Sequence, residues 1–568
     1  MKSTKPFSIP LSRLLTAVLL AAAAALPARA QLLQQNTDFT RGDTLRGSIT
    51  PQRAWWDVTF YDLHVAIDPA DSSISGYNEI HYRVTEPRQG RAMQIDLQDP
   101  LQIDRVTANG TGLEVRKAAG SAYFVDMDPA GAQRPGEIHT VTVRYHGTPR
   151  IARNPPWDGG FVWSRDELGN PWIATANQGI GASIWWPNKD HQSDEPDSMG
   201  IHITVPSPLV NVSNGRLRGR TEHDDGTVTW SWFVRNPINN YNVAVNAGNY
   251  AHFGDTLKGE LGRLDLDYWV LKQHLPKARQ QFVQVKPVVR CFEHWFGPYP
   301  FYEDSFKLVH TPYLGMEHQS AIAYGNRFMN GYLGEDLSGT GWGLTWDYII
   351  VHETGHEWFG NNITTKDVAD MWVHEGFTFY SEPLYTECLY GKQAGADYII
   401  GARDMIQNQR PIIGPYGVNE EGSRDMYFKG GNLLHTIRQI VDDDPLWRAI
   451  LRGLNHTFWH QTVTSAQVER YIIEQSGKDL GKVFDQYLRH ARIPALQHYF
   501  EGGRIHYRWR ADVAGFEMPV KVKLSEGLYT FIRPSSEEWR SSPFLLDHPS
   551  EFEVNRNFYV DTERVRPQ

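Results

Sequence analysis

The sequence contains little cysteine, no long apolar run after residue 30 and no surplus of positive charge. Only Cys291 and Cys388 are cysteines among 568 residues, and the sequence does not decide between one disulfide and two unpaired thiols. Neither lies near the start of the chain, so no cysteine there can carry a lipid. The formal charge of −10 argues against nucleic acid or an anionic membrane as a partner.

The one long apolar run lies at the start of the chain. A basic beginning precedes the run from Leu14 to Leu26, and Ala28-Arg29-Ala30 follows as a small-x-small cleavage site. The run is shorter than the roughly 20 residues that a membrane-spanning helix needs. The pattern is typical of a secretory signal peptide over residues 1–30. We therefore expect an exported protein, periplasmic or secreted, without stable membrane insertion.

The pattern of apolar and polar residues changes three times after residue 30. Residues 31–54 are polar and indicate a flexible lead-in. Over residues 55–255, stretches such as "DVTFYDLHVAI" and "TVTWSWFV" alternate apolar and polar side chains, which predicts an antiparallel β domain. Residues 256–495 show mainly helical spacing, and residues 496–568 return to short strands such as "RIHYRW" and "VKVKL". The sequence predicts a multidomain α+β protein that ends in a small β module.

Helical spacing recurs in five segments, and Pro287 should break or kink the first of them. The expected helices are 278–296, 344–360, 366–382, 429–442 and 465–491. No internal repeat and no low-complexity tract are present beyond the alanines near the start.

The stretch "VHETGHEWFG" carries two histidines on the second of these helices. Positions i and i+4 share a helical face, so His352 and His356 can direct two imidazoles at one metal ion. Glu353 lies on the rim of the same face, where it can serve as a general base. A lone His-Glu-x-x-His pattern also occurs by chance in amphipathic helices. The pattern needs a third ligand, because zinc in a hydrolase takes three protein ligands and leaves one position open.

Glu375 is the candidate third ligand. It follows His356 by nineteen positions, enough for the first helix to end and a second to bring a carboxylate back. Glu382 lies two turns further along the same face and can hydrogen-bond a ligand histidine. Together these residues predict one zinc ion per chain, held by two histidines and one glutamate.

His352-Glu353-x-x-His356, eighteen residues and Glu375 together resemble the zinc signature of the aminopeptidase N and leukotriene-hydrolase family, within the gluzincins. Three further stretches occur in that family's order: "TANQGIGASIWWPNKD", "LGMEHQS" and "MYFKGG". The opening strand "WDVTFYDLHVAIDP" is also similar. The resemblance covers residues 55–495 and implies a thermolysin-like, mainly α catalytic domain.

The resemblance implies further roles for residues outside the zinc signature. Tyr427, in "MYFKGG", would donate its hydroxyl to the oxyanion, and Glu317, in "LGMEHQS", would bind the free α-ammonium of a peptide. Gln178 is similar to a second amine-binding position. Gly315 and Met316 belong to the same motif as Glu317, with Met316 near the side-chain pocket of the N-terminal residue.

The sequence departs from the family pattern in three places. Leu314 and His318 replace the first glycine and the last asparagine of the exopeptidase motif, and His374 stands where asparagine is usual. We expect both histidines to lie around the metal ligands or to face solvent. About seventy β-like residues follow Leu496, where relatives carry a large helical domain, so we expect an open cleft that admits longer peptides.

Three functions remain open at this stage. The leading one is a zinc aminopeptidase that acts on peptides with a free N-terminus. A zinc endopeptidase would share the metal site without needing Glu317, and a catalytically silent peptide-binding protein would need neither Glu353 nor Tyr427. Epoxide hydrolysis, known in one branch of the family, has no specific support. The preferred N-terminal residue and the oligomeric state cannot be derived from the sequence.

Overall fold

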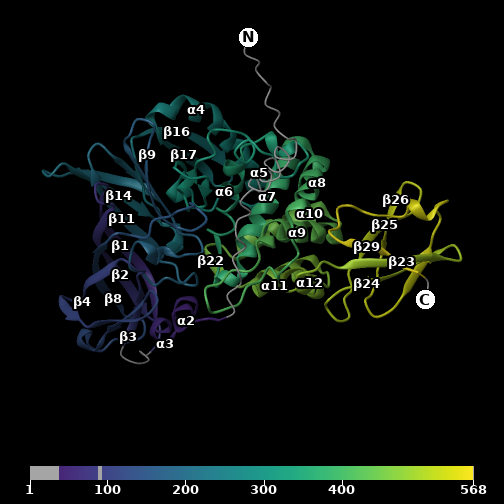
Figure 1. The fold of residues 1–568 in the computed structure, drawn as a ribbon, viewed down its shortest axis with the longest axis horizontal. Helices are drawn as coiled ribbons and strands as arrows, with labels where there is room; N and C mark the ends of the chain where they lie inside the picture. Colours follow the sequence, from purple (N-terminus) through teal and green to yellow (C-terminus); the bar gives the residue numbers. More distant parts are fainter. Residues whose placement is uncertain (1–37, 87–91, 567–568) are drawn as a thin grey trace, which may run out of the picture. The chain divides into compact units, whose positions relative to one another are not determined.

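The computed structural model describes residues 38–86 and 92–566. An eight-stranded sheet lies in the first half of the chain, with the strand order β13-β14-β11-β1-β2-β8-β4-β5 (Figure 1). Its strands are β1 (Trp56–Asp68), β2 (Ser73–Val84), β4 (Gln102–Ala108), β5 (Thr111–Leu113), β8 (Ile138–Gly147), β11 (Ser198–Pro206), β13 (Arg216–Glu222) and β14 (Thr227–Val234).

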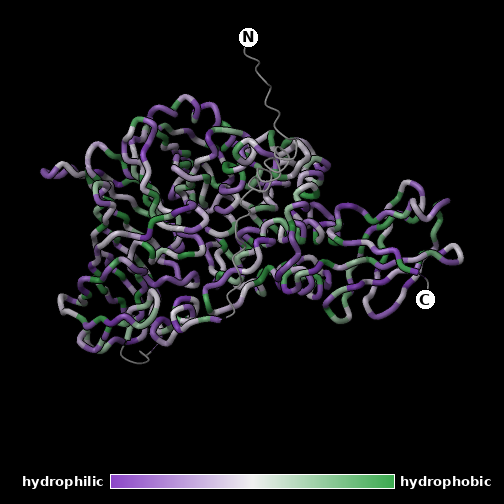
Figure 2. Tube along the Cα trace, in the orientation of Figure 1, coloured by the Kyte–Doolittle hydropathy of each residue, from purple (hydrophilic) through white to green (hydrophobic). Residues whose placement is uncertain are grey.

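Alternation of side chains explains why one face of this sheet is buried. Successive residues of β14 alternate between buried and partly exposed, and those of β1 largely do so. Figure 2 shows hydrophilic and hydrophobic residues interspersed along the chain. The expected antiparallel pattern holds for every pair in this sheet except one, because β1 and β11 are parallel. A parallel pair requires a long connection, and the chain between β2 and β11 supplies it.

Two smaller sheets accompany the large one. They have the strand orders β12-β15-β10-β9 and β3-β7-β6. Their strands are β3 (Ala92–Asp96), β6 (Val115–Ala119), β7 (Ala122–Asp126), β9 (Gly160–Arg165), β10 (Pro171–Ala176), β12 (Val210–Val212) and β15 (Asn246–Gly248). The loop that follows β10 carries Gln178, so the β-rich half of the chain places this residue.

The expected flexible lead-in is ordered from Thr40 onward, which corrects the sequence-based expectation. Helices α2 (Arg41–Gly47) and α3 (Pro51–Ala54) form there, and a Thr40–Asp43 capping box begins the first. Arg53 is fully buried and forms an ion pair with Asp96 of β3. The Arg53–Asp96 ion pair anchors residues 40–54 to β3, and the polar composition of that segment gave no sign of such a buried contact.

A five-stranded sheet with the order β16-β17-β18-β20-β19 begins the second half. Its strands are β16 (Tyr250–Gly259), β17 (Gly262–Leu271), β18 (Phe306–His310), β19 (Gly315–Met316) and β20 (Ile322–Tyr324). The boundary expected after residue 255 falls inside β16. Strand β19 is at the edge of this sheet, and it carries two residues of the expected exopeptidase motif.

Nine α-helices follow in the second half of the described chain. They are α4 (Leu275–Gln281), α5 (Val285–Phe296), α6 (Tyr348–Gly355), α7 (Trp372–Tyr390), α8 (Lys392–Gly401), α9 (Phe428–Val441), α10 (Asp444–Thr457), α11 (Ser465–Ser476) and α12 (Gly481–Arg489). The two-stranded sheet of β21 (Ile363–Thr365) and β22 (Gln461–Val463) lies among them.

Local signals set several helix boundaries differently from the expected ranges. The chain between Gln281 and Val285 forms a 3-10 turn, and Pro287 then occupies the first turn of α5, where proline is tolerated. Asp347 caps α6 through the backbone N–H groups of Ile349 and Ile350, so this helix begins later than residue 344. Gly477, in a left-handed conformation, ends α11 and separates it from α12.

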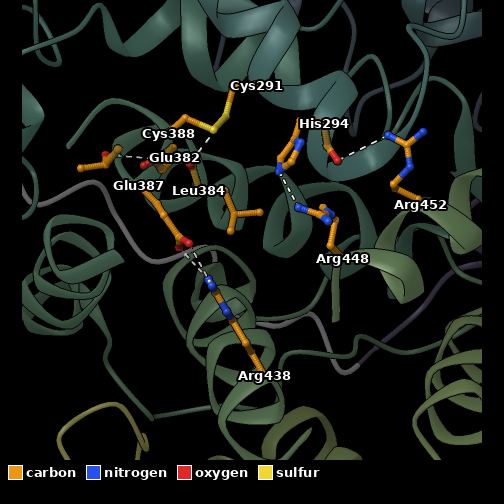
Figure 3. Close-up of a disulfide and its surroundings, with 10 residues drawn as sticks. Cys291, His294, Glu382, Leu384, Glu387, Cys388, Arg438, Arg448 and Arg452 are labelled. Carbon is orange, nitrogen blue, oxygen red and sulfur yellow. Dashed lines mark hydrogen bonds and ion pairs between the residues drawn. A yellow bond between two sulfur atoms is a disulfide. The ribbon is translucent and has the colours of Figure 1, made fainter. Parts of the chain in front are cut away.

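A disulfide joins two of the helices. Cys291 of α5 and Cys388 of α7 are bonded, with 6.2 Å between their Cα atoms (Figure 3). The bond closes a loop with a sequence separation of 97 residues. In the chain-entropy treatment, a loop of that size stabilises the folded state by about 4–5 kcal/mol. The sequence had left the state of these cysteines open.

Two sheets, with the orders β27-β24-β23-β29 and β26-β25-β28, form the last part of the chain. Their strands are β23 (Ala495–Glu501), β24 (Arg504–Arg510), β25 (Val520–Ser525), β26 (Leu528–Ile532), β27 (Arg540–Pro543), β28 (Glu553–Val554) and β29 (Asp561–Arg564). The described residues from Thr40 onward group as one unit by their internal contacts. In the described ranges, every helix is too short or too polar to span a membrane. The expected signal peptide lies outside the described residues.

The buried ion pair predicts a stability difference between two arginines of the lead-in. Arg53→Met leaves the Asp96 carboxylate buried without its partner, and we expect a loss of about 3 kcal/mol in the free energy of unfolding. Arg41→Met is the matched control, because Arg41 is exposed and its removal should change that free energy by less than about 0.5 kcal/mol. Urea unfolding of both variants measures the difference, and equal midpoints would contradict the expectation.

Candidate metal centre and active site

Helices α6 and α7 lie side by side and bring the three predicted ligands together (Figure 1). His352 lies in the last turn of α6, and His356 is the residue that caps its C-terminus with a helical backbone conformation. Glu375 lies in the first turn of α7. Its Oε2 atom is 3.3 Å from His356 Nε2 and 3.8 Å from His352 Nε2. The imidazoles of His352 and His356 therefore keep the predicted i, i+4 spacing, although α6 is shorter than expected.

The three side chains fit a zinc ion. All are buried, and their ligand atoms lie within 4.8 Å of one another. Glu375 Oε2 is buried and has no hydrogen-bond partner among the described residues. A buried carboxylate oxygen normally has a partner, and a bound cation would serve as one here. Two imidazoles and one carboxylate are a donor set that zinc takes in hydrolases.

Both histidines are oriented through their other ring nitrogen. His352 Nδ1 is 2.8 Å from Glu382 Oε1, and His356 Nδ1 is 3.0 Å from the Phe359 carbonyl oxygen. Tyr398 donates its hydroxyl to the second oxygen of Glu382 at 2.5 Å. Such contacts fix the ring orientation and leave Nε2 free to bind a metal. Glu382 was assigned to this place from its spacing, whereas nothing in the sequence pointed to Tyr398.

The charges of the ligands depend on each other. Burial alone would raise the pKa of Glu375, but the charge of His356 and the close approach of both imidazoles outweigh it and hold that pKa well below its ordinary value. Burial disfavours the cationic form of His352, yet the carboxylates of Glu375 and Glu382 raise its pKa. The site is built for positive charge at its centre, and a divalent ion can supply that charge in place of protons.

Glu353 is buried next to the ligands. Burial raises the pKa of its carboxyl to about 7, the charges of Glu317 and Glu375 act in the same direction, and the two histidines oppose them. A carboxylate with a pKa near the working pH is suited to general-base catalysis. A Cβ atom on Gly315 of β19 would lie 2.8 Å from Glu353 Oε1. Only glycine therefore lets the edge strand approach this carboxylate so closely.

Glu317 follows β19 directly and lies close to Glu353 and the metal ligand His356. It is 2% exposed, and its Oε1 atom has no hydrogen-bond partner in the described part of the chain. Its carboxylate and that of Glu353 come within 4.8 Å of each other and of a ring nitrogen of His356. Asn361 donates its side-chain amide to the Glu317 carbonyl oxygen at 2.9 Å and holds the backbone there.

Tyr427 stands at the beginning of α9, and its ring lies 6.1 Å from that of His352. Burial, followed by the charges of Glu375, Glu421 and Glu317, raises the pKa of its phenol well above the ordinary value. The hydroxyl therefore keeps its proton at neutral pH and can act as a hydrogen-bond donor.

Gln178 reaches the metal ligands from the β-rich half of the chain. Its side-chain amide donates to Glu375 Oε1 at 2.6 Å, across a separation of 197 residues. The next residue, Gly179, accepts hydrogen bonds on its carbonyl oxygen from Arg46 of α2 and from Asn419. The ordered lead-in thus supports the loop that carries Gln178.

Met316 belongs to an apolar cluster beside the exopeptidase motif. It is buried in a small cluster with Tyr313, Ala323 and residues of β9 and β10. The Tyr313 hydroxyl donates to the Thr175 carbonyl oxygen at 2.7 Å, which joins this cluster to β10. The cluster therefore links the exopeptidase motif to the β-rich half.

The two unexpected histidines are buried, so neither faces solvent. His374 Nε2 accepts a hydrogen bond from the Thr365 backbone N–H at 2.8 Å. Both ring nitrogens of His318 lack a hydrogen-bond partner within the described residues. Burial lowers the pKa of each ring to about 3, so both are neutral. Neither belongs to a group of possible metal ligands in the described ranges.

Sequence patterns missed three residues around Glu317 and Glu375. Tyr241 is buried, and burial together with the charges of Glu317 and Glu375 raises the pKa of its phenol well above the ordinary value. Glu421 lies against Gly179, and Asn361 directly follows the quoted metal-binding stretch. Only the position of Asn361 offered a signal in the sequence, because it stands next to the end of that stretch.

Glu382 gives a test of the metal centre that leaves all three ligands in place. Glu382→Gln keeps the volume but removes the charge that faces His352, so we expect zinc affinity to fall by about 10–100-fold. Competition against a chromophoric chelator measures this affinity. Glu335→Gln is the matched control, since Glu335 is exposed and should retain the original affinity. An unchanged affinity in Glu382→Gln would refute the assignment.

Comparison with known proteins places this geometry in a family. Residues 283–487 match the peptidase family M1 domain. Probable aminopeptidase 2 of Sulfurisphaera tokodaii is 22% identical over 385 residues, which are 63% of this chain and 47% of that protein. Leukotriene A-4 hydrolase of Xenopus laevis is 22% identical over 287 residues, 48% of this chain and 44% of that protein. The chain thus spans about half the length of these relatives or less.

Solved structures show the same fold. The crystal structure of an M1 zinc metallopeptidase from Deinococcus radiodurans matches with a TM-score of 0.66 and 21% identity, over 78% of this chain and 95% of that one. A mutant from the same organism, bound to a Tyr-Ser-Ala substrate, matches with a TM-score of 0.64 at 21% identity, over 78% of this chain and 96% of that one. The matched segment, residues 283–487, is a peptidase family M1 domain, and the relatives and structures together support an aminopeptidase N-like family of gluzincins.

Proposed function

We propose that this chain is an exported zinc aminopeptidase that hydrolyses the N-terminal peptide bond of peptides. One catalytic zinc ion would be held by His352, His356 and Glu375, within a thermolysin-like, mainly α catalytic domain that is followed by a small C-terminal β module. The disulfide between Cys291 and Cys388 supports an oxidising compartment, as does the signal-like sequence at the start of the chain.

One observation carries the choice of an aminopeptidase. The buried Glu317 carboxylate has an unpartnered oxygen, and its ligand atom lies within 4.8 Å of those of Glu353 and His356. A buried carboxylate at that distance from the base is suited to binding an α-ammonium group one residue away from the scissile bond. An endopeptidase would have to leave this negative charge facing an uncharged peptide backbone, which costs desolvation energy without a partner.

The residues divide the reaction between them. A zinc ion held at the centre supplies Lewis acidity, which polarises the scissile carbonyl and makes water more acidic. Glu353 accepts a proton from the attacking water and delivers it to the leaving nitrogen as the C–N bond breaks. Tyr427 donates its hydroxyl to the oxygen that gains negative charge. Glu317 binds the α-ammonium, and Gln178 borders the same space through its contact with Glu375.

The edge strand β19 offers a way to align the peptide. Gly315 and Met316 pair with β20 on one side only, which leaves the other edge of the strand unpaired within the sheet. Extended peptides add to such edges through backbone hydrogen bonds. This arrangement would place the substrate backbone beside Glu353.

Chromogenic aminoacyl amides with free and with acetylated N-termini test the proposal. We expect cleavage of the free-amine set alone, lost with a chelator and reduced by at least about 100-fold in Glu353→Ala, because the base is removed while the ligands remain. Zinc content of the variant, measured in parallel, controls for loss of the metal. Cleavage of internal bonds in blocked peptides would indicate an endopeptidase. No turnover of either set, with zinc bound, would indicate a peptide-binding protein.

Tyr427→Phe separates transition-state stabilisation from substrate binding. Removing one oxyanion donor should lower kcat by about 100–1,000-fold with little change in KM, since the hydroxyl acts after the substrate has bound. Steady-state kinetics on the best free-amine substrate provide both constants. A raised KM at constant kcat would assign Tyr427 to substrate binding instead.

A further inference from the structure

A second group of possible metal ligands lies on the eight-stranded sheet, among elements separate from the catalytic centre. It consists of Asp62 and His64 of β1 and His202 of β11. His64 and His202 stand opposite each other in the parallel pair, and Asp62 precedes His64 by two residues. Residues at i and i+2 of a strand share one face, so the three side chains project from the same side of the sheet. In Figure 1, β1 and β11 are adjacent.

The donor atoms have the spacing of a metal site. Asp62 Oδ1 lies 3.0 Å from His202 Nε2 and 3.4 Å from His64 Nε2. Bonds of 2.0–2.2 Å at tetrahedral angles place neighbouring ligand atoms about 3.3–3.6 Å apart. The corresponding distances at the catalytic centre are 3.3 and 3.8 Å, so the second group is at least as closely assembled as the first.

Neighbouring side chains orient both rings. His202 Nδ1 is 2.8 Å from Ser231 Oγ, a contact of the kind that fixes a ligand histidine through its other nitrogen. The His64 ring stacks on Tyr77 at a centroid distance of 4.5 Å and on His202 at 4.2 Å, with 13° between the two imidazole planes. One imidazole therefore has to turn out of this stack before both Nε2 lone pairs can point at a single ion. Glu79 stands opposite Asp62 on β2, so a second carboxylate lies on the same face.

Gly200 keeps the space between the donor atoms open. It stands opposite Asp62 on β11, and a Cβ atom there would lie 2.7 Å from Asp62 Oδ1 and 3.3 Å from His202 Nε2. Its backbone is extended strand, in which any residue is tolerated, so the glycine is not required by conformation. Glycine instead leaves room beside Asp62 Oδ1 and His202 Nε2.

We propose that Asp62, His64 and His202 bind a second divalent transition-metal ion, of the class of zinc. The donor set matches the two-histidine, one-carboxylate chemistry of such ions. The side chains of Asp62, His64 and His202 are 30%, 32% and 26% exposed, so the ion keeps coordination positions open to solvent and exchanges with it. The alternative is a metal-free cluster in which Asp62 accepts hydrogen bonds from both rings.

The test counts metal ions in the untagged chain, because a histidine tag would bind zinc itself. Wild type and variants are dialysed to equilibrium against buffer with micromolar free zinc, and zinc per chain is measured by mass spectrometry. We expect Asp62→Asn to hold one ion fewer than wild type. Gly200→Ala should lose the same ion although every ligand remains, because its methyl group occupies the space beside Asp62. Circular dichroism confirms that each variant is folded.

His81→Ala is the matched control. His81 stands on β2, opposite Phe60 on the same face, and its Nδ1 bonds Thr140 Oγ1 rather than the cluster. It should hold as many ions as wild type. Equal zinc counts in wild type and Asp62→Asn would overturn the proposal, and so would an equal loss in His81→Ala, which would indicate unspecific binding to surface histidines. Because the readout is a difference in ion count, it does not depend on peptidase activity.

Discussion

The metal centre depends on three buried glutamates that lie close to one histidine. Glu317, Glu353 and Glu375 all lie near His356, shielded from water. Two like charges 4 Å apart repel by about 4 kcal/mol at the effective dielectric of a protein, and burial of each adds a further cost. Only a strong positive charge at the centre makes such an arrangement stable. A divalent ion meets this requirement. Without an ion, the two imidazoles hold the pKa of Glu375 below its ordinary value, whereas burial raises that of Glu353.

The surrounding fold holds these charges in place through contacts distant in sequence. The disulfide joins α5 to α7, the helix that carries Glu375 and Glu382. Gln178 contacts Glu375 from a loop that α2 supports, and α3 is tied to β3 through the buried Arg53. Each half of the chain therefore contributes to one centre, so loosening the β-rich half is expected to disturb a site whose ligands all belong to the helical half.

The two groups of possible metal ligands use the same chemistry under different conditions. At the catalytic centre the ligands are buried, and a hydrogen bond to Glu382 or to a backbone carbonyl orients each imidazole. On the sheet the donors are a quarter to a third exposed, and a hydroxyl and stacked rings hold them. Burial strengthens the interaction of an ion with its ligands and slows its exchange. The difference suits a resident ion in the first group and an exchangeable ion in the second.

The sequence by itself determined what lies within a few helical turns or along one strand. The spacing of His352 and His356 places both rings on one face of α6, and the seven residues from Glu375 to Glu382 span two turns of α7. Alternation identified the strands of the sheets. Only the tertiary structure decided that Cys291 pairs with Cys388, that Gln178 meets Glu375, and that His64 stands beside His202. Local periodicity follows from backbone geometry, whereas pairing between distant segments depends on the packing of the whole chain, which no short stretch of sequence encodes.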